Sequence, residues 1–480
     1  MTGIAHSTVG FEEGEMTSTA RFDVDALRAR IAGAALLPGE AGYDDARSLW
    51  NGEIDRRPAV IVQCRTAADV AAAVELAREE GLELAVRGGA HGVAGRAICD
   101  DGLMIDLSTM KSISVDSARR RAVVQPGVSL AELDAATQEH GLAVPAGTVS
   151  HTGIAGLTLG GGMGYLTGLY GLTIDNLLRA EVVLADGSIV TASADEHPDL
   201  FWALRGGGGN FGVVTSFEFR LHPVGPEVQF ALLFWHHDAG IAPVRACRDV
   251  VSELPDQAGC LFAIGLNAPP APFVPEEHHF ALGSALILVS FGSAEEQARI
   301  LEPLHRDFPP LFELVTPMPY TGAQQAIDDS APWGGLYYEK SLYLDELGDD
   351  ALEVLFSRAR AKTSPMSFSF AFPLIGEYAR VADDATAYGG RRSVQFVVDV
   401  VAASTDAETL AAERQWVRDT ADLLRPLAGT AGAYVNYFDS DDDDRVRATY
   451  GAAKYDRLAE IKGRYDPANL FRGNVNIKPA

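Results

Sequence analysis

The segment AVRGGAHGVAG, residues 85–95, places one histidine, His91, in a loop that is nearly free of side chains. The apolar stretch LELAV (82–86) predicts a strand that leads into the loop, and Arg87 stands directly before the glycines. Glycine allows close backbone approach that a Cβ would prevent. No lysine, serine nucleophile or metal-ligand partner accompanies the imidazole. The loop therefore raises the question of which ligand needs bare backbone beside one histidine.

Composition excludes several classes of partner. A chain of 480 residues with 47% hydrophobic content can bury a large core and form about two to three domains. Its formal charge of -27 argues against nucleic acid, whose phosphates need clustered Lys and Arg, and against an anionic membrane surface. No apolar run is long enough to span a bilayer. The first residues lack the basic and apolar regions of a signal peptide, so we expect a cytoplasmic protein.

The cysteines predict neither a disulfide framework nor a metal centre. They are scattered along the chain, with no Cys-x-x-Cys pair and no His/Cys zinc spacing: Cys64, Cys99, Cys247 and Cys260. We therefore expect that the four thiols are free and that no metal is bound.

The element pattern predicts an α+β fold in which residues 1–20 form a disordered tail. Residues 21–226 mix helices with hairpins. Thr66 should cap a helix that stops at Gly81, Ser129 and Glu132 form a capping box, and Asp186-Gly187 supplies the positive φ angles of a hairpin turn.

Residues 227–430 predict a second domain built on an antiparallel sheet covered by helices. Ser293 and Glu296 form a capping box at the start of one helix, and 408–424 predicts another. Long apolar strands alternate with these helices: VQFALLFW (228–235), SALILVSFG (284–292), MSFSFAFPL (366–374) and SVQFVVDVV (393–401). Residues 431–480 are expected to return to the first domain.

Two further glycine-rich segments are TLGGGMG (158–164) and RGGGGNFG (205–212). A dinucleotide fingerprint follows a strand and opens a helix, whereas residues 197–219 read as helix, glycines, strand. No phosphate-binding GxxxxGK[ST] motif is present. Each segment alone could serve a tight turn. Together they favour backbone N–H groups that approach one extended anionic ligand.

These motifs resemble those of the berberine bridge enzyme-like FAD-linked oxidases in the vanillyl alcohol oxidase superfamily. They occur in the family's order and cover nearly the whole chain beyond about Tyr43: AVRGGAHGVAG (85–95), HTGIAGLTLGGGMGYLTGLYGLTIDNLL (151–178), PDLFWALRGGGGNFGVVT (198–215), AYVNYFD (433–439) and RYDPANLFRGNVNI (464–477). The resemblance implies a two-domain FAD-binding fold of the vanillyl alcohol oxidase type, with a substrate domain on an antiparallel sheet.

The resemblance also implies that His91 carries FAD through a covalent bond to the 8α-methyl group of the flavin. A neutral imidazole is a competent nucleophile near pH 7. Many relatives add a bond to a cysteine, but that position is Val149 here, so we expect a single attachment. The other residues that the resemblance assigns to the cofactor are Arg87, Gly88, Gly89, Ala90, Gly92, Gly153, Gly156, Gly160, Gly161, Gly162, Gly164, Asp175, Asn176, Gly212, Val213, Val214, Asn474 and Asn476.

Tyr437 is the catalytic base that the resemblance implies. A tyrosine acts as a base near neutral pH only if its pKa is lowered by nearby cations or donors. If 433–439 is a strand, Tyr437 points away from Tyr434 and Asn436. A core aromatic residue remains the alternative interpretation of Tyr437.

Two other residues are catalytic candidates. In the predicted strand 393–401, alternation places Gln395, Val397 and Asp399 on one face. Some relatives carry an acidic residue on this strand, but its position is occupied here by Val397, so Gln395 is the candidate for a hydrogen bond to substrate. His151 is interpreted either as a contact to the flavin or substrate, or as a turn histidine. The phenylalanines Phe368, Phe370 and Phe372 are expected in the core rather than in a pocket.

The resemblance implies an oxidase that removes hydride from a small organic molecule and reduces O2 to H2O2. The substrate is an alcohol, an amine or a phenolic natural product, possibly with oxidative cyclisation. Thr152 occupies a position that is often small and apolar in such oxidases, so a dehydrogenase with another electron acceptor is an alternative. A flavin-binding protein without turnover is a second alternative. We expect a monomer or a homodimer.

Overall fold

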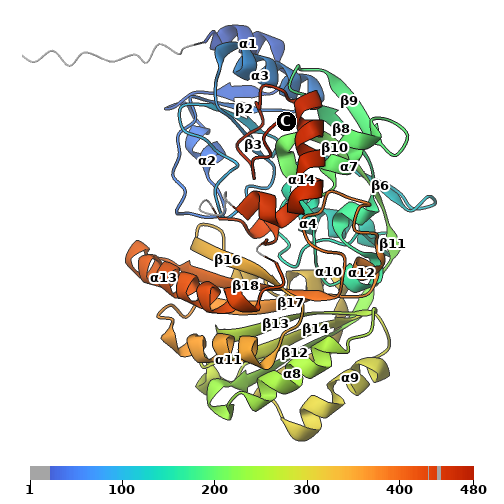
Figure 1. Ribbon diagram of the computed structural model, residues 1–480, viewed down its shortest axis with the longest axis vertical. Coiled ribbons are helices and arrows are strands. Elements are labelled where there is room, and N and C mark those ends of the chain that lie inside the picture. The colour runs from blue at the N-terminus through green and yellow to red at the C-terminus, as the bar shows by residue number, and fades with distance from the viewer. Residues whose placement is uncertain (1–21, 431, 440–444) are drawn as a thin grey trace, which may run out of the picture.

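The computed structural model describes residues 22–430, 432–439 and 445–480. The predicted tail at 1–20 lies outside the described residues. In Figure 1 the chain forms two stacked parts, and the large sheet of the lower part faces the upper part. None of the helices in the described ranges is both long enough and apolar enough to cross a membrane.

The upper part contains a four-stranded sheet with the order β1-β2-β4-β3, in which β2, β4 and β3 are parallel. Its elements are α1 (Val24–Arg30), β1 (Ala34–Leu36), α2 (Tyr43–Arg47), β2 (Val60–Gln63), α3 (Ala67–Glu80), β3 (Leu84–Arg87) and β4 (Leu103–Asp106). As predicted, Thr66 caps α3 in a capping box, here with Asp69, and Gly81 ends the helix at a φ of 64°. The strand β3 delivers the loop of His91 to the interior.

A five-stranded antiparallel sheet with the order β5-β6-β10-β8-β9 completes the upper part. The predicted capping box of Ser129 and Glu132 is present at α4. The elements of this region are β5 (Ile113–Asp116), β6 (Arg121–Val124), α4 (Leu130–Gln138), β7 (Leu142–Ala143), α5 (Ile154–Gly160), α6 (Thr167–Tyr170), the 3-10 turn η1 (Thr173–Asn176), β8 (Leu177–Val183), β9 (Ile189–Ser193), α7 (Pro198–Leu204), η2 (Gly208–Asn210), β10 (Val213–Arg220) and β11 (His222–Pro223).

The hairpin of β8 and β9 differs from the prediction at its turn. The last pair of the ladder is Val183 with Ile189, so five residues form the connection rather than a two-residue turn. Of the expected pair, only Gly187 has a positive φ, 87°. The longer loop does not need a left-handed Asp186.

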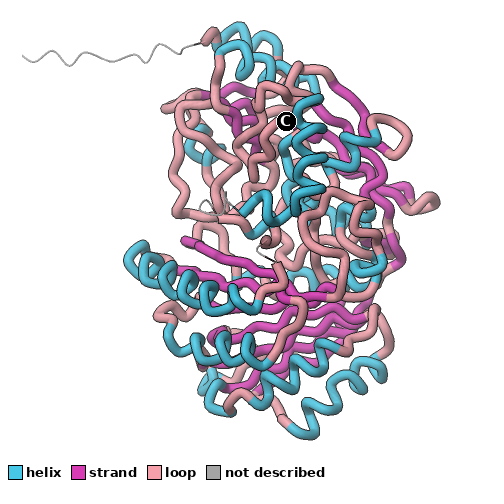
Figure 2. Tube along the Cα trace, in the orientation of Figure 1, coloured by secondary structure: helices cyan, strands magenta, loops and turns pink. Residues whose placement is uncertain are grey.

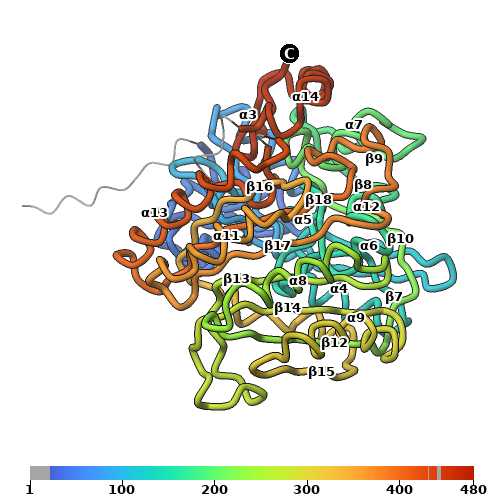
Figure 3. The backbone as a smooth tube through the Cα atoms, turned by 60° about the horizontal axis from the view of Figure 1, so that its bottom comes forward, coloured from blue at the N-terminus to red at the C-terminus, as the bar shows by residue number. Residues whose placement is uncertain are grey.

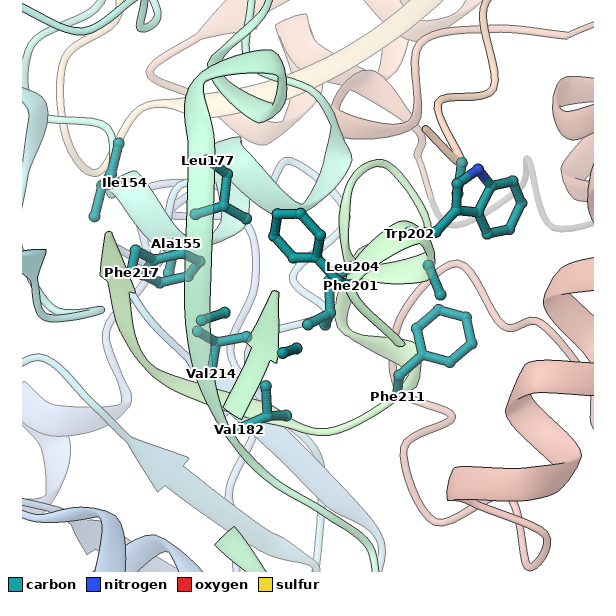
Figure 4. Packing of buried hydrophobic residues seen from close by; sticks show 14 of the residues in the cluster. Ile154, Ala155, Leu177, Val182, Phe201, Trp202, Leu204, Phe211, Val214 and Phe217 are labelled. Atoms are coloured by element: carbon teal, nitrogen blue, oxygen red, sulfur yellow. The ribbon is translucent and has the colours of Figure 1, made fainter. Parts of the chain in front are cut away.

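The C-terminal segment packs into the upper part. Helix α14 (Val446–Tyr465) lies there beside α7, and it was not predicted. Figure 4 shows the apolar core around α5, α7 and β10, with Phe201, Trp202, Phe211 and Phe217 among its largest side chains. Val475 and Ile477 join the same buried cluster. The last residues of the chain are therefore part of the first core.

The lower part is a seven-stranded antiparallel sheet with the order β15-β12-β14-β13-β17-β18-β16. The predicted capping box of Ser293 and Glu296 opens α9. The elements are β12 (Glu227–His236), η3 (His237–Ala239), α8 (Ala242–Ser252), β13 (Ala258–Asn267), η4 (Glu276–His278), β14 (Leu282–Ser290), α9 (Ala294–Asp307), β15 (Phe312–Pro319), α10 (Tyr320–Gln325), η5 (Asp328–Ser330), β16 (Leu336–Leu344), α11 (Asp349–Arg358), η6 (Ala359–Ala361), β17 (Phe368–Leu374), α12 (Glu377–Arg380), β18 (Gln395–Ser404), α13 (Ala407–Leu424), η7 (Arg425–Leu427) and η8 (Val435–Tyr437).

The two faces of this sheet have different neighbours. Helices α8, α9, α11 and α13 cover the outer face, as Figures 2 and 3 show, and their apolar residues join one buried cluster with the sheet. The inner face packs against residues of the upper part, such as Tyr165 and Ile174. Side chains on the inner face of the sheet therefore meet the glycine loops of the upper part.

Candidate active site

A cavity of about 760 Å³ lies between the glycine loops and the inner face of the large sheet. This volume is in the range of roughly 300–1,000 Å³ typical of small-molecule and cofactor sites. One end is lined by glycines and by Asn474, and the other by apolar side chains of the sheet.

Thirteen of the predicted site residues line this cavity. They come from all three glycine-rich segments and from both C-terminal motifs: Gly88, Gly89, Ala90, His91, Gly92, Gly153, Gly156, Gly160, Gly212, Val213, Val214, Tyr437 and Asn474. The fold thus brings five separated sequence motifs to one cavity.

Other predicted site residues hold the framework instead. Arg87 donates to the carbonyl of Ala46, and Asp175 forms a buried ion pair with Arg392 at 2.7 Å. Asn176 donates its amide to the carbonyls of Tyr170 and Leu172. None of Arg87, Asp175, Asn176, Asn476, His151 and Gln395 is among the residues that line the cavity, and neither are Gly161, Gly162 and Gly164.

The glycines serve two distinct purposes. A Cβ on Gly89 would lie 2.4 Å from the Cα of Gly153, so these two residues let their loops touch. A Cβ on Gly164 would lie 1.8 Å from the carbonyl oxygen of Ala146, which makes that glycine a packing requirement. In contrast, a Cβ on Gly92 or Gly156 would meet no atom within 4 Å. Both line the cavity, so they keep space open for a ligand.

His91 is held on two sides. Its ring stacks on Trp50, with centroids 4.3 Å apart and planes inclined by 13°. Its Nε2 is 3.1 Å from Nδ1 of His151. Burial, and secondarily the neighbouring His151, lower the pKa of His91 to about 3. The imidazole is therefore neutral at physiological pH, which is the nucleophilic form.

Trp50 links the His91 loop to the large sheet. Its indole also stacks on Tyr337 of β16 at 3.9 Å, and its Nε1 donates to the carbonyl of Ala331. The adjacent Asn51 donates to the carbonyls of Val93 and Tyr337. Sequence reasoning missed Trp50, because no local pattern indicates a partner 287 positions away along the chain.

Tyr437 lies in a different local structure from the one predicted. Residues 435–437 form the 3-10 turn η8 rather than a strand, so alternation does not separate Tyr437 from Tyr434. The two rings meet edge to face at 5.0 Å. Burial, with the added negative charge of Asp399 and Glu339, raises the pKa of Tyr437 well above its usual value. The lowered pKa that a tyrosine base requires is thus not met, and Tyr437 keeps its proton.

Gln395 needs a correction, because it lies away from the cavity. Its side chain is fully buried and donates to the hydroxyl of Tyr378 and the carbonyl of Arg391. Asp399 lines the cavity instead. It lies two residues after Val397 in β18 and therefore on the same face of the strand. Glu339 of β16 lines it as well and was also missed. Alternation identified the correct face of β18 but not the position along it.

The three phenylalanines of β17 join the core, as expected, and two of them also line the cavity. Phe370 and Phe372 belong to the buried cluster of the inner face, and Phe368 packs against it. Phe368 and Phe370 line the cavity as well.

None of the four cysteines lines the cavity, and all four are buried with free thiols. Val149, which the resemblance places where many relatives carry the attachment cysteine, does line it. In the described part of the chain, no group of three His, Cys, Asp or Glu residues could hold a metal ion.

Comparison with known proteins agrees with this architecture. Residues 58–193 match the model of an FAD binding domain, and residues 433–478 match the model described as berberine and berberine like. An FAD-linked oxidoreductase of Dictyostelium discoideum is 31% identical over 94% of this chain and 95% of its own length. The chain belongs to the berberine bridge enzyme-like family of FAD-linked oxidoreductases.

Two solved relatives share the whole fold. 6-Hydroxy-D-nicotine oxidase from Arthrobacter nicotinovorans has a TM-score of 0.84 and 27% identity, covering 94% of this chain and 98% of that one. Glucooligosaccharide oxidase from Acremonium strictum, described with a 6-S-cysteinyl, 8α-N1-histidyl FAD, has a TM-score of 0.79 and 25% identity, covering 95% of this chain and 99% of that one. The protein is an FAD-linked oxidoreductase with the two-domain α+β fold of this family.

The residues of the cavity fit FAD. The glycine-lined end offers open space at Gly92 and Gly156, and Asn474 is fixed there by donating to the carbonyl of Gly209. Arg96 also lines this end and donates to the carbonyl of Asn474 at 3.0 Å. A cation and exposed backbone N–H groups suit a pyrophosphate. This end of the cavity would therefore hold the pyrophosphate of FAD.

Proposed function

We propose that this protein is an oxidase whose FAD is attached through His91 alone and whose substrate is a small organic molecule. Bound FAD would accept a hydride from the substrate and pass the electrons to O2, giving H2O2. The observation that carries the proposal is a neutral His91 on the cavity wall, held between Trp50 and His151.

The contact to His151 supports attachment through one particular ring nitrogen. Nε2 of His91 faces Nδ1 of His151, so we assign the Nε2 proton to this hydrogen bond and the bond to flavin to Nδ1. The N1-histidyl linkage named for glucooligosaccharide oxidase uses the same nitrogen. His151 thus acts by fixing the tautomer of His91. The absence of a cavity cysteine supports a single bond.

We assign the substrate's proton to Asp399 rather than to Tyr437. The Asp399 side chain is buried at the cavity wall, and Tyr437 keeps its own proton. The Tyr437 hydroxyl then fits a hydrogen-bond donor that orients the substrate. Phe368 and Phe370 exclude water from the reacting end.

The test of the attachment is the fate of flavin colour on denaturation. Acid-precipitated wild-type protein should stay yellow and give a fluorescent flavin band on a denaturing gel. His91→Ala should release its flavin under the same conditions. Proteolysis should give one flavin peptide, which contains His91. If wild-type flavin washes out freely, the covalent part of the proposal fails.

Peroxide release tests the oxidase part. Air-saturated holoenzyme should release one H2O2 for each substrate oxidised. A dehydrogenase of the same fold would bleach its flavin with substrate but return to the oxidised form only with another acceptor. The dehydrogenase is included because Thr152, a polar residue at a position expected to be small and apolar in an oxidase, lines the cavity.

A further inference from the structure

The cavity extends across the inner face of the large sheet, well beyond the place where the substrate would react. Asp399 of β18 and Tyr437 line the reacting end. Residues of the next strands in the sheet order continue the lining as far as Leu232 of β12. Because β12 is four strands away from β18 and neighbouring strands are about 4.8 Å apart, the lining continues for about 19 Å past Asp399. The cavity is therefore much longer than one oxidisable group requires.

The far end of the cavity, here called the distal arm, is built by the lower part. It is lined by Leu232, by Ile287 of β14 and by the lining residues within 266–280, where the chain passes from β13 to β14. This connection folds back onto the sheet, because Phe273 meets Phe312 of β15 at a ring-centroid distance of 6.4 Å. The glycine-rich segments that would hold FAD belong to the upper part. The distal arm therefore lies apart from the cofactor residues.

The distal arm is apolar. Among its described lining residues, Asn267 is the only one with a polar side chain. The amide of Asn267 is already engaged, since its nitrogen donates to the carbonyl of Phe280 at 2.7 Å and its oxygen accepts from Nζ of Lys362. A hydroxyl or a charged group of a ligand would lose water in the arm and meet mainly apolar neighbours. The distal arm therefore favours an alkyl or aromatic group.

Phe280 stands at the mouth of the distal arm. It lines the cavity although it is 60% exposed, so the arm reaches solvent there. Its backbone has a φ of 62°, a left-handed conformation that bulky residues rarely adopt. Its N–H donates to the carbonyl of Ala268 at 2.8 Å, and its own carbonyl accepts from Asn267, so the strained backbone is held from both sides. Such strain is concentrated at functional sites, where it positions a side chain.

We propose that the substrate is an elongated and mainly apolar molecule, with its oxidisable group beside Asp399 and its far part in the distal arm against Phe280. This inference rests on the proposed oxidase function and narrows its substrate. The alcohol, amine or phenolic group then stands at one end of an alkyl or aromatic body. A sugar oligomer of the same length would have to remove water from its hydroxyl groups in an apolar arm. Phe280 is thus a specificity-determining residue.

A pair of aryl ketones measures the distal arm without turnover. Acetophenone and hexanophenone share a phenyl ketone, which has no alcohol or amine carbon that could lose a hydride, and hexanophenone adds four methylene groups. Each ketone is titrated into the holoenzyme, and its dissociation constant is measured by calorimetry. Complete burial of a methylene group tightens binding by about fourfold. We expect hexanophenone to bind at least about thirtyfold more tightly than acetophenone, since burial of the chain need not be complete.

Two variants in the distal arm and one outside it complete the test. Phe280→Gly removes the ring, and glycine adopts the positive φ without strain. Ala271→Trp places an indole in the arm that Ala271 lines. Each should reduce the ratio of the two affinities by at least about fivefold while the affinity for acetophenone changes little. Val394→Ala is the control and should keep the wild-type ratio, because Val394 is exposed and does not line the cavity. A wild-type ratio near one, or a ratio that survives both arm substitutions, would overturn the inference.

Substrate oxidation separates this inference from the proposed function. Flavin reduction is followed without O2 for benzyl alcohol and benzylamine, for their 4-hexyl derivatives, and for cellobiose as a polar molecule of similar length. The 4-hexyl compounds should reduce the flavin with a higher kcat/KM than the parent compounds or cellobiose. Faster reduction by cellobiose or by the parent compounds would overturn the inference and leave the oxidase proposal intact. Binding that depends on chain length, without reduction by any of these compounds, would support the distal arm and count against the oxidase proposal.

Discussion

Trp50 lies flat against His91, with ring centroids 4.3 Å apart and planes inclined by 13°, and its other face stacks on Tyr337. The segment before β2 thus joins the cofactor loop to the substrate sheet through three parallel rings. The indole Nε1 donates to the carbonyl of Ala331, so the indole cannot rotate without losing this part-buried hydrogen bond. The fixed indole in turn fixes the orientation of the His91 ring that stacks on it.

Removal of the indole should impair flavin attachment. Trp50→Leu abolishes the aromatic face and should lower the fraction of covalently bound flavin by several-fold, while Trp50→Phe keeps a stacking ring and should retain most of it. The fraction is measured from flavin fluorescence in a denaturing gel against total protein. Trp333→Leu is the control, since Trp333 is 47% exposed and meets only the edge of His151. A wild-type fraction in Trp50→Leu would show that stacking does not position His91.

If FAD is attached through His91 alone, as proposed, a thiol at position 149 should create a second bond to the flavin. Val149 lines the cavity, and cysteine is slightly smaller than valine, so Val149→Cys introduces a nucleophile without a clash. Peptide mass spectrometry should then detect flavin bonded to both His91 and Cys at 149. Val149→Ala should show the histidyl adduct alone. A free thiol in Val149→Cys would mean that the position is not adjacent to the flavin ring.

The base and the hydrogen-bond donor can be separated by substitution. Asp399→Asn should slow flavin reduction by roughly two to four orders of magnitude, the usual effect of losing a positioned general base. Tyr437→Phe should slow it by about fivefold, because one hydrogen bond is worth roughly 1 kcal/mol. Anaerobic stopped-flow measurement of flavin reduction checks both. The reverse order, with loss of an ionisation in Tyr437→Phe, would return the base to Tyr437.

Local signals were sufficient for much of the fold. Capping boxes at Thr66, Ser129 and Ser293 fix helix starts through contacts within three residues, and all three are present. Apolar runs identified four of the seven strands of the large sheet, β12, β14, β17 and β18, and alternation identified the face of β18 that meets the upper part, whereas β13, β15 and β16 were not predicted. These features are determined by neighbours in sequence, which is why a single chain reveals them.

Features that depend on distant partners could not be predicted. Asp399 rather than Gln395 lines the cavity because of where the upper part leaves the inner face of the sheet uncovered. The position of Tyr437 depends on a turn, and the tyrosine ring packs on Phe370 of β17. Gly161, Gly162 and Gly164 were assigned to the cofactor, yet they do not line the cavity, and a Cβ on Gly164 would meet the carbonyl of Ala146. Motif resemblance located the cavity residues as a group. It did not separate the residues that line the cavity from those that support it.

Asp134 offers a pH-dependent test of the contact between the two parts. It lies on α4, nearly free of solvent, and accepts a hydrogen bond from Gln324 of α10 through one oxygen, while its Oδ1 has no hydrogen-bond partner. Burial raises the pKa of Asp134 to about 7. The folded state therefore holds this proton more tightly than the unfolded chain, where a carboxyl titrates near its ordinary value.

The sign of the effect follows from linkage. Below pH 4 both states are protonated and the stabilising contribution is complete. Between pH 4 and about 7 the unfolded state ionises first, so the free energy of unfolding falls as pH rises, and above about 7 the loss is complete. Asp134→Asn cannot ionise and still accepts from Gln324. It should therefore raise the free energy of unfolding by roughly 1–3 kcal/mol at pH 8 and change it much less at pH 5, as measured by chemical denaturation.

Asp25→Asn on α1, whose side chain is 89% exposed, is the control and should leave the free energy of unfolding unchanged at both pH values. Equal shifts for Asp134→Asn at both pH values would show that Asp134 does not titrate between them, and its carboxyl would then be protonated, or ionised, throughout.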